Sequence, residues 1–244
     1  MQYEKLTRAG RKILPVLYPS RCPLCDHRVK GETLLCPNCR GGLPLIKGKR
    51  CRVCSKPISE GESLCGDCRR VHHEFDRALG ILLYDDRMRR SLSWLKYKGR
   101  AHIGLAWGRF LYLAAGSYMR ACGSEVLVPV PVHEDRLKKR GYNQADVLAK
   151  GLSKASGLPV VTGAVVRRGQ TGALKTMDRS GRAGAMRQAF GPGAAEVAGR
   201  RVLIVDDIYT TGATADAVSR VLLDRGAASV SVLTVCIGAG VVLK

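Results

Sequence analysis

The chain has 244 residues, of which 45% are hydrophobic and 25% are charged, a balance that is typical of a folded globular protein and excludes a disordered one. Its formal net charge of +21, from 41 basic and 20 acidic residues, favours anionic partners such as nucleotides or nucleic acid, although a basic surface can also serve solubility alone. No apolar run approaches the ~18–20 residues of a membrane span, and basic residues interrupt the first apolar ones, so we expect a cytoplasmic protein with no signal peptide and no membrane span.

Eight of the ten cysteines follow a short amphipathic segment at residues 6–17 and form four C-x-x-C pairs. Ten residues separate the first two pairs, ten separate the last two, and the whole unit recurs after 29 residues, which indicates an internal duplication. Because each C-x-x-C turn places two thiolates on one metal ion, two turns complete a tetrahedral site, and four pairs predict two structural Zn²⁺ ions. The expected zinc ligands are Cys22, Cys25, Cys36, Cys39, Cys51, Cys54, Cys65 and Cys68.

Disulfide bonds are the alternative use of these cysteines, and a cytoplasmic setting disfavours them. The spacing leaves open whether each repeat closes its own site or the pairs interleave, and we favour one zinc ion per repeat. His72 and His73 follow the last pair and offer alternative ligands that the sites do not need. The composition changes after this point, so we predict a cysteine-rich zinc module at residues 1–72 and a second domain at residues 73–244.

The second domain opens with a predicted strand at residues 78–84. Residues 87–100 then mix basic and aromatic side chains, a pattern that can stack bases and bind phosphates, although a solvated helix with an apolar inner face is an equal alternative. Residues 103–118 predict a helix, and residues 126–132 begin as a buried strand that proline ends.

Two basic segments lie between this strand and the C-terminal third of the chain. The first contains Arg136, Lys139 and Arg140, and a plain run of surface charge is its alternative interpretation. Asn143 is expected to cap the helix that follows, and residues 158–161 predict a further strand.

The second basic segment, at residues 167–190, is long and has no clear periodicity. Such a loop in a compact domain usually has a function, and this one could close over a site; a surface loop without a catalytic role is the alternative. Its basic and hydroxyl residues include Arg167, Arg168, Thr171, Lys175, Arg179 and Arg182.

The stretch at residues 202–214 carries the strongest chemical signal in the chain. Its first four residues are apolar and predict a strand buried on both faces, and open α/β sheets bind ligands at the carboxyl ends of such strands. Asp206 and Asp207 follow, and two adjacent carboxylates could accept hydrogen bonds from vicinal hydroxyls or hold Mg²⁺ through water. In the next turn Gly212 lets the backbone approach a ligand, and the N-terminus of the following helix favours a phosphate. The expected phosphate ligands are Thr210, Thr211, Gly212, Ala213 and Thr214.

Phosphate on the turn and a diol on the carboxylates together describe a ribose 5-phosphate. The alternative is an ordinary strand-to-helix turn in which the acid pair caps the helix. The run from strand through acid pair to Thr/Gly turn resembles the signature of type I phosphoribosyltransferases, which bind phosphoribosyl pyrophosphate (PRPP) with Mg²⁺. This resemblance implies that Asp206 and Asp207 bind the ribose hydroxyls and form the catalytic pair. It also implies that residues 210–214 hold the 5-phosphate.

Taken with the cysteine repeats, the Val-Pro-Val-Pro strand and the Arg-Gly-Tyr-Asn-Gln sequence at residues 140–144, the chain resembles the ComF family. These competence protein F-like phosphoribosyltransferases carry an N-terminal zinc ribbon. The resemblance implies an α/β fold, a type I phosphoribosyltransferase-like parallel sheet flanked by helices, behind a small Cys-rich double zinc ribbon at residues 1–72. It further implies a pyrophosphate site after the first core strand, where we select Arg136, Arg140 and Lys139. The sequence departs from the family pattern at Ala185, where asparagine is expected.

Two functions follow from the resemblance. The first is an enzyme that transfers the phosphoribosyl group from Mg-PRPP to an acceptor and releases pyrophosphate, linked to DNA uptake and natural transformation. The second is a non-enzymatic module that binds PRPP or a nucleotide together with single-stranded DNA. In either case a protein of the competence machinery is an expected partner, and the sequence identifies neither the acceptor nor a general base.

Overall fold

The computed structural model describes residues 20–30, 33–168 and 188–238. The amphipathic segment predicted at residues 6–17 lies outside the described residues. So do Thr171, Lys175, Arg179 and Arg182 of the second basic segment.

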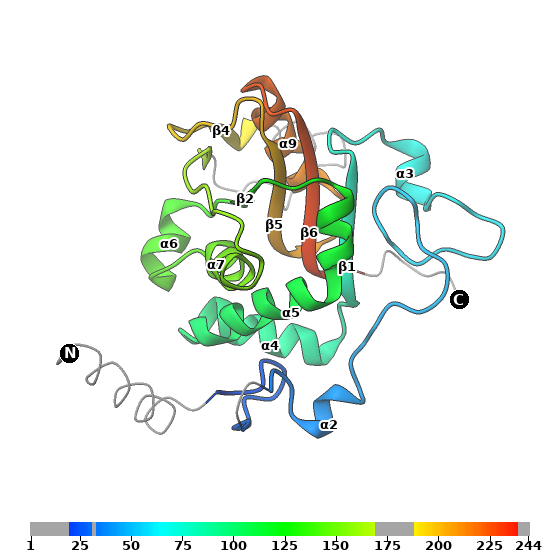
Figure 1. The fold of residues 1–244 in the computed structure, drawn as a ribbon, viewed down its shortest axis with the longest axis vertical. Helices are drawn as coiled ribbons and strands as arrows, with labels where there is room; N and C mark the ends of the chain where they lie inside the picture. Colours follow the sequence, from blue (N-terminus) through cyan, green and yellow to red (C-terminus); the bar gives the residue numbers. More distant parts are fainter. Residues whose placement is uncertain (1–19, 31–32, 169–187, 239–244) are drawn as a thin grey trace, which may run out of the picture.

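Within these described residues, four parallel strands form one sheet in the order β1-β6-β5-β2 (Figure 1). The two central strands, β5 and β6, consist largely of apolar residues because helices cover both of their faces, as is usual for parallel sheets. Two short strands, β3 and β4, pair antiparallel beside this sheet. The bounds are β1 Arg77–Leu83, β2 Val126–Pro129, β3 Val165–Arg167, β4 Phe190–Pro192, β5 Arg201–Tyr209 and β6 Ser229–Ile237.

Helices cover both faces of the sheet, and alternate residues of β5 point to one face or the other. Leu203 and Val205 pack into the cluster that α4, α5 and α7 form on one face, whereas Val202 and Ile204 pack into the cluster with α9 on the other. The helix bounds are α2 Pro37–Arg40, α3 Gly66–Arg70, α4 Asp86–Tyr97, α5 Ala101–Ala121, α6 Glu134–Arg140, α7 Gln144–Ser156 and α9 Ala213–Asp224. In the part of the chain that is described, none of these helices combines the length and hydrophobicity that a membrane crossing needs.

Glycines allow α5 and α7 to cross in direct backbone contact. A Cβ atom on Gly108 of α5 would collide with the carbonyl oxygen of Leu148, and one on Gly151 of α7 would collide with that of Leu105. This close crossing places α7 over the central strands, with Leu148 and Leu152 fully buried.

Two predicted strands differ from the structure, and one predicted helix cap agrees with it. The strand predicted from residue 202 continues to Tyr209, which pairs with Ile237, so the acid pair lies inside β5 and not after it. The strand predicted at residues 158–161 is wrong, because this segment makes only a single parallel bridge, from Val160 to Leu127. The predicted cap is confirmed: the Asn143 side chain accepts a hydrogen bond from the Ala145 N–H at 3.1 Å.

The two cysteine repeats pack on opposite faces of the sheet. The first repeat (residues 22–39) contributes Cys22 and Leu24 to the cluster of α4, α5 and α7. The second repeat (residues 51–68) contributes Cys51 and Cys54 to the cluster that contains α9. In Figure 1, α2 of the first repeat lies beneath α4, while α3 of the second lies to the side of β1. The boundary between residues 72 and 73 stays a prediction, and the second repeat shares its hydrophobic core with the sheet.

Candidate functional site

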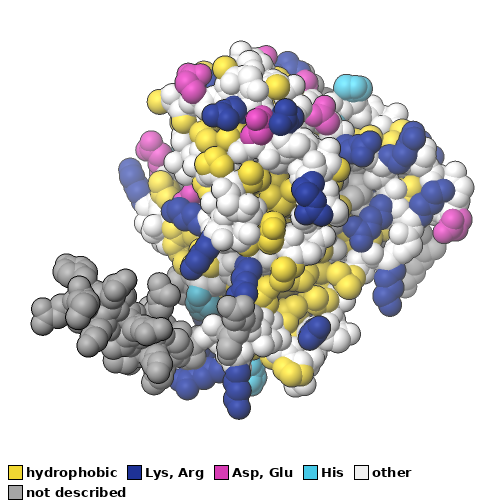
Figure 2. All heavy atoms as spheres, viewed as in Figure 1, with side chains coloured by type: hydrophobic (Ala, Val, Ile, Leu, Met, Phe, Trp, Pro, Cys, Tyr) yellow, Lys and Arg dark blue, Asp and Glu magenta, His cyan; other side chains and the backbone are white. Residues whose placement is uncertain are grey.

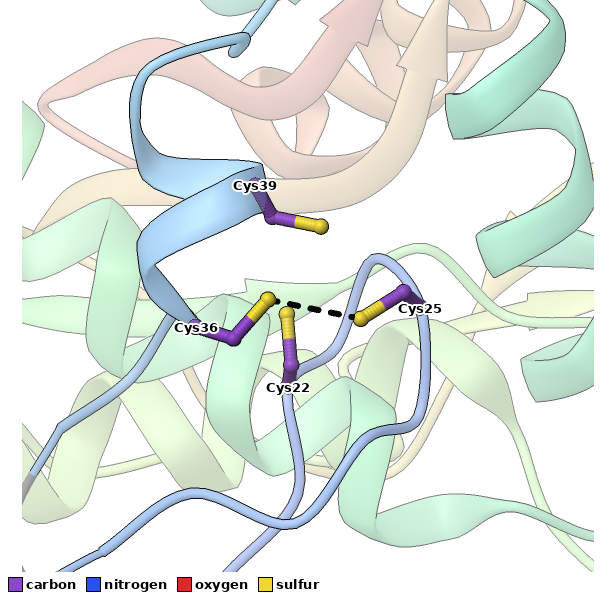
Figure 3. Close-up of side chains that lie close together, drawn as sticks. All are labelled: Cys22, Cys25, Cys36 and Cys39. Atoms are coloured by element: carbon purple, nitrogen blue, oxygen red, sulfur yellow. Dashed lines mark hydrogen bonds between the residues drawn. The ribbon is translucent and has the colours of Figure 1, made fainter.

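The eight paired cysteines form two groups, and each group belongs to one repeat. Within each group the sulfur atoms all lie within 4.8 Å of one another, and Cys25 Sγ is 3.5 Å from Cys36 Sγ. Four Zn–S bonds of about 2.3 Å in a tetrahedron require sulfur atoms about 3.8 Å apart, so both groups fit a structural zinc ion. Figure 3 shows the first group, in which Cys22 and Cys25 from a turn converge with Cys36, the N-cap of α2, and Cys39 within α2. All ten cysteines are free, so the disulfide alternative is not realised in this structure.

The environment of the second repeat shifts its cysteine pKa values in both directions: burial raises the pKa of Cys54 to about 12, whereas the pKa of Cys51 is lowered. Burial raises the pKa of Cys51, but hydrogen bonds from backbone N–H groups, those of Cys54, Cys65 and Val53, outweigh this effect and bring the pKa to about 7. Four sulfur ligands leave no open coordination position, and the two groups therefore have the chemistry of structural sites.

A small pocket with a cavity volume of about 30 Å³, open to solvent, lies where β5 passes into α9. Gly212 adopts the left-handed conformation, with φ of 90°, and immediately precedes α9. The N-terminus of a helix presents unpaired N–H groups and a partial positive charge, which together favour a phosphate. The polar and loop residues that line the pocket are Asp206, Tyr209, Thr210, Gly212, Thr214 and Thr234. Thr211 and Ala213 belong to the same segment, residues 210–214, and the Thr211 hydroxyl accepts from the Ala213 N–H at 3.4 Å.

The two aspartates have different environments because neighbouring residues of a strand face opposite sides of the sheet. Asp206 lines the pocket, and its Oδ1 atom accepts a hydrogen bond from the Asp207 N–H at 2.8 Å. Asp207 is 4% exposed and forms an ion pair with Lys96 of α4, on the other face. The pair therefore does not present two equivalent carboxylates to one ligand.

The charges of this cluster shift one another's pKa values. Burial raises the pKa of Asp206 well above its ordinary value, and the negative charge of Asp207 raises it further. Burial lowers the pKa of Lys96, but the carboxylates of Asp207 and Asp206 outweigh this effect and the pKa is raised. A ligand that brings a cation or hydroxyl donors to the pocket would stabilise the ionised form of Asp206.

The basic residues selected for pyrophosphate binding lie on helix α6 and not in a loop. Arg136 and Lys139 are exposed, whereas the Arg140 guanidinium lies 5.1 Å from the ring centre of Tyr97 and donates to Gln144 Oε1 at 2.7 Å. The structure thus turns Arg140 toward α4.

Arg167 of β3 is a site residue that sequence reasoning treated only as part of a basic segment. Burial lowers its pKa, the positive charge of Arg136 lowers it further, and the charge of Asp206 raises it. Arg167 therefore lies close enough to both Arg136 and Asp206 for their charges to affect it. Lys96 and Thr234 also belong to the site, but sequence reasoning did not select them. Their only signal in the sequence is a polar residue within an otherwise apolar or mixed segment.

Comparison with known proteins agrees with this architecture. Residues 13–69 match the double zinc ribbon domain family, and residues 137–240 match the phosphoribosyl transferase domain family. The fold and the two sulfur clusters therefore define a phosphoribosyltransferase-type α/β domain that follows a double zinc ribbon, as the sequence predicted.

Three curated relatives resemble this chain over much of its length. Competence protein F of Haemophilus influenzae is 29% identical over 163 residues, which cover 65% of this chain and 71% of that protein. Competence protein ComFC of Bacillus subtilis is 32% identical over 63% of this chain, and the match spans only 61% of ComFC. The DNA utilization protein YhgH of Escherichia coli K12 is 28% identical over 88% of this chain and 89% of that protein. The chain is therefore a homologue of competence protein F, ComFC and YhgH at 28–32% identity, with a double zinc ribbon domain followed by a phosphoribosyltransferase domain.

Proposed function

We propose that this protein binds Mg-PRPP and transfers its phosphoribosyl group to an acceptor with release of pyrophosphate. The observation that carries the proposal is the pocket at the junction of β5 and α9, where Asp206 faces the residues 210–214 across one cavity. A carboxylate beside a helix N-terminus suits a ligand that has hydroxyls at one end and a phosphate at the other. By their names, the relatives act in competence or DNA utilization, and we extend that biological setting to this chain.

Different residues of the site bind different parts of PRPP. The N–H groups and hydroxyls of residues 210–214 hold the 5-phosphate, and Asp206 accepts hydrogen bonds from the ribose hydroxyls. Asp207 holds the Lys96 ammonium group near the site through their ion pair. When Lys96 turns to an anionic ligand, the Asp207 carboxylate becomes available beside that of Asp206. Mg²⁺ that arrives with PRPP offsets the charge of the pyrophosphate.

In the reaction, the bond between C1 of the ribose and the pyrophosphate oxygen breaks, and the pyrophosphate leaves with the electron pair. The acceptor forms a new bond to C1 and loses its proton. Positive charge on C1 and negative charge on the leaving group both grow in the transition state, so fixed charges contribute most of the catalysis. Arg136, Lys139 and Arg140 of α6 are the proposed pyrophosphate ligands, and Arg167 joins them because it responds to the charges of both Arg136 and Asp206.

Thermal unfolding with and without Mg-PRPP tests the binding step, since a ligand that binds only the folded state raises the melting temperature. The double variant Asp206→Asn/Asp207→Asn should lose this shift. A shift that survives in the double variant removes the assignment of the site. A screen of nucleobases and amines for pyrophosphate release then tests the transfer reaction.

A second candidate is a binding module that recognises PRPP or a nucleotide and single-stranded DNA without any transfer. The exposed Tyr97 ring, which is 67% exposed, favours this candidate, as does Arg100, whose guanidinium lies 5.0 Å from the ring centre of Trp94. Aromatic rings interleaved with arginines can stack bases and bind the backbone. Lys and Arg side chains are also spread over the visible face in Figure 2.

This candidate predicts an affinity for single-stranded DNA that falls steeply with salt concentration. Binding releases cations from the DNA, and this release is less favourable when the solution already contains more salt. Tyr97→Ala should weaken that affinity, and the absence of DNA binding at low salt would dismiss the candidate. A competence-machinery protein that docks on the zinc ribbons remains a proposed partner, to be sought by pull-down with the first repeat intact and disrupted.

A further inference from the structure

His73 follows the second repeat and connects its last cysteine to the 210–214 segment. The His73 side chain is only 2% exposed and lies between two groups that come from different parts of the fold. Its Nδ1 atom is 2.9 Å from a carboxylate oxygen of Asp216, in the first turn of α9. Its Nε2 atom is 3.4 Å from Cys68 Sγ, in the second group of four cysteines.

The same imidazole fixes the glycine that begins the proposed phosphate site. A Cβ atom on Gly212 would come within 2.7 Å of His73 Cε1 and within 2.5 Å of the Tyr209 hydroxyl. The ring therefore packs against the backbone of Gly212 itself. Its own position is held from behind by Phe75, which stacks on it with ring centres 4.7 Å apart.

Asp216 connects this contact to the start of α9. Its carboxylate accepts from His73 Nδ1 and from the Glu74 backbone N–H at 3.0 Å, and its own N–H donates to the Gly212 carbonyl at 2.8 Å. A displacement of His73 would thus free both the Asp216 side chain and Gly212, the two residues that shape the N-terminus of α9. The cysteines of the second repeat are buried in the same cluster as Tyr209 and Ala215, which flank the segment.

The first repeat has no equivalent role, because it packs on the opposite face. Its Asp26 is paired with Arg100 at 2.5 Å and with His102 at 3.1 Å, and the Pro23 carbonyl accepts from the Ser91 hydroxyl at 2.5 Å. These contacts go to α4 and α5. The duplication has therefore produced two repeats of similar sequence with different neighbours.

We propose that His73 is a positioning residue that couples metal occupancy of the second four-cysteine site to phosphate binding by residues 210–214. With zinc bound, Cys68 is fixed, His73 is held against Gly212 and Asp216, and the helix N-terminus is ready to receive a phosphate. Without zinc, the sulfur atoms separate and this support is lost. The inference rests on the proposed PRPP site, and it concerns how that site is held in shape.

The first test compares the two repeats in the full chain, with Mg-PRPP as the probe. Cys65→Ser/Cys68→Ser and Cys36→Ser/Cys39→Ser should each lose one zinc ion, measured by elemental analysis. Titration calorimetry should show affinity lowered about 10-fold or more by the first pair, in the range of ordinary coupling between sites, and changed less than about 2-fold by the second. Equal losses in the two variants would overturn the proposal.

The second test separates the two contacts of the imidazole without removing a metal ligand. His73→Asn keeps a donor near the Nδ1 position and should retain most of the affinity for Mg-PRPP, whereas His73→Gln and His73→Ala should lose it with both zinc ions still bound. His72→Ala is the matched control, because the neighbouring side chain is exposed. If His73→Ala binds Mg-PRPP as the wild type does, His73 has no positioning role.

The third test needs no ligand and so separates this inference from the proposed function. Hydrogen exchange of the backbone amides at residues 209–216 should accelerate in His73→Ala and in the Cys65→Ser/Cys68→Ser variant, but not in His72→Ala. Unchanged exchange overturns the coupling even if PRPP binds. A wild-type protein that fails to bind Mg-PRPP overturns the proposed function, while accelerated exchange would still support the structural link from His73 to the segment.

Coupling between two sites is reciprocal, which gives a final measurement on the wild-type protein. Mg-PRPP should raise the zinc affinity of the second site by the same factor, about 10-fold, in equilibrium competition with a coloured chelator. The zinc ion of the first repeat should be insensitive to the ligand. Equal protection of both zinc ions, or of neither, contradicts the proposal.

Discussion

Lys96 of α4 forms an ion pair with Asp207 of β5, and the two side chains are only 21% and 6% exposed. Replacement of the lysine by the uncharged Lys96→Met leaves a buried carboxylate without its partner, which typically lowers the free energy of unfolding by about 3 kcal/mol or more. Urea unfolding of the single variants and of Lys96→Met/Asp207→Asn measures the pair. The double variant should recover most of the loss, and additive losses would show that the two charges do not interact.

The same ion pair predicts how stability depends on alkaline pH. The pKa of Lys96 is raised in the folded state above its ordinary value of 10.5, so the folded protein holds this proton more tightly than the unfolded chain. The resulting stability is fully present below about pH 10.5 and is lost as the pH rises through the raised folded pKa. Melting temperatures in this alkaline range should fall more steeply in the wild type than in Lys96→Met.

Asp206→Asn should stabilise the ligand-free protein and remove its response to Mg-PRPP. Burial and Asp207 raise the pKa of Asp206 above its ordinary value of 3.8, so the stability linked to this proton is present below that pH and is lost as the pH rises through the folded pKa. The folded-state environment of this carboxyl group therefore opposes folding near neutral pH, and replacement of the group should add roughly 0.5–2 kcal/mol, as stabilising substitutions at functional sites often do. Thermal unfolding at pH 7 checks this, with the exposed Asp224→Asn as control. A less stable Asp206→Asn protein would contradict the assignment.

Gly108→Ala should destabilise the crossing of α5 and α7. The new methyl group would meet the backbone of Leu148 and Gly151, and because backbone cannot move aside cheaply the loss should be about 1–3 kcal/mol. Gly116→Ala on the same helix is the matched control, since its methyl group approaches only an Arg120 nitrogen, at 3.5 Å. That control should gain about 0.5–1 kcal/mol from the helix propensity of alanine. Denaturant midpoints of the two variants should move in opposite directions.

Gly212→Ala should reduce affinity for Mg-PRPP beyond what its backbone strain explains. Residue 212 has a φ of 90°, and an added methyl group would also collide with Tyr209 and His73. Gly157→Ala is the control, because its φ is 79° but a methyl group there has open space. Both variants should lose stability of about 1–2 kcal/mol, and only Gly212→Ala should weaken binding in calorimetry. If the Gly212→Ala and Gly157→Ala variants bind Mg-PRPP equally well, the ligand does not bind at residues 210–214.

The purified protein should contain two zinc ions per chain, one for each group of four sulfur atoms. Removal of the zinc by a strong chelator at neutral pH should lower the melting temperature, because a structural zinc contributes its binding free energy to folding. Elemental analysis and thermal unfolding before and after chelation check both expectations. One zinc ion per chain, or an unchanged melting temperature after complete removal, would contradict them.

Much of this protein could be predicted from local sequence, because the relevant signals repeat or alternate along the chain. The 29-residue repeat grouped the cysteines, and the sulfur clusters follow it without interleaving. The apolar runs at residues 202–205 and 230–237 identified the two central strands, and the cap at Asn143 needed only its own side chain and the next two residues. The strand predicted at residues 158–161 failed because a short apolar run does not reveal whether a partner strand lies beside it.

Only the tertiary structure decided which side chains meet across elements. Lys96 and Asp207 are far apart in sequence, as are His73 and Asp216, and no periodicity within either element encodes the partner. The alternation of β5 sends Asp206 and Asp207 to opposite faces, which the adjacent letters of the sequence do not suggest. Likewise two repeats with the same cysteine spacing dock on opposite faces of one sheet. Local sequence sets the geometry of each element, whereas contacts between elements depend on the packing of the whole core.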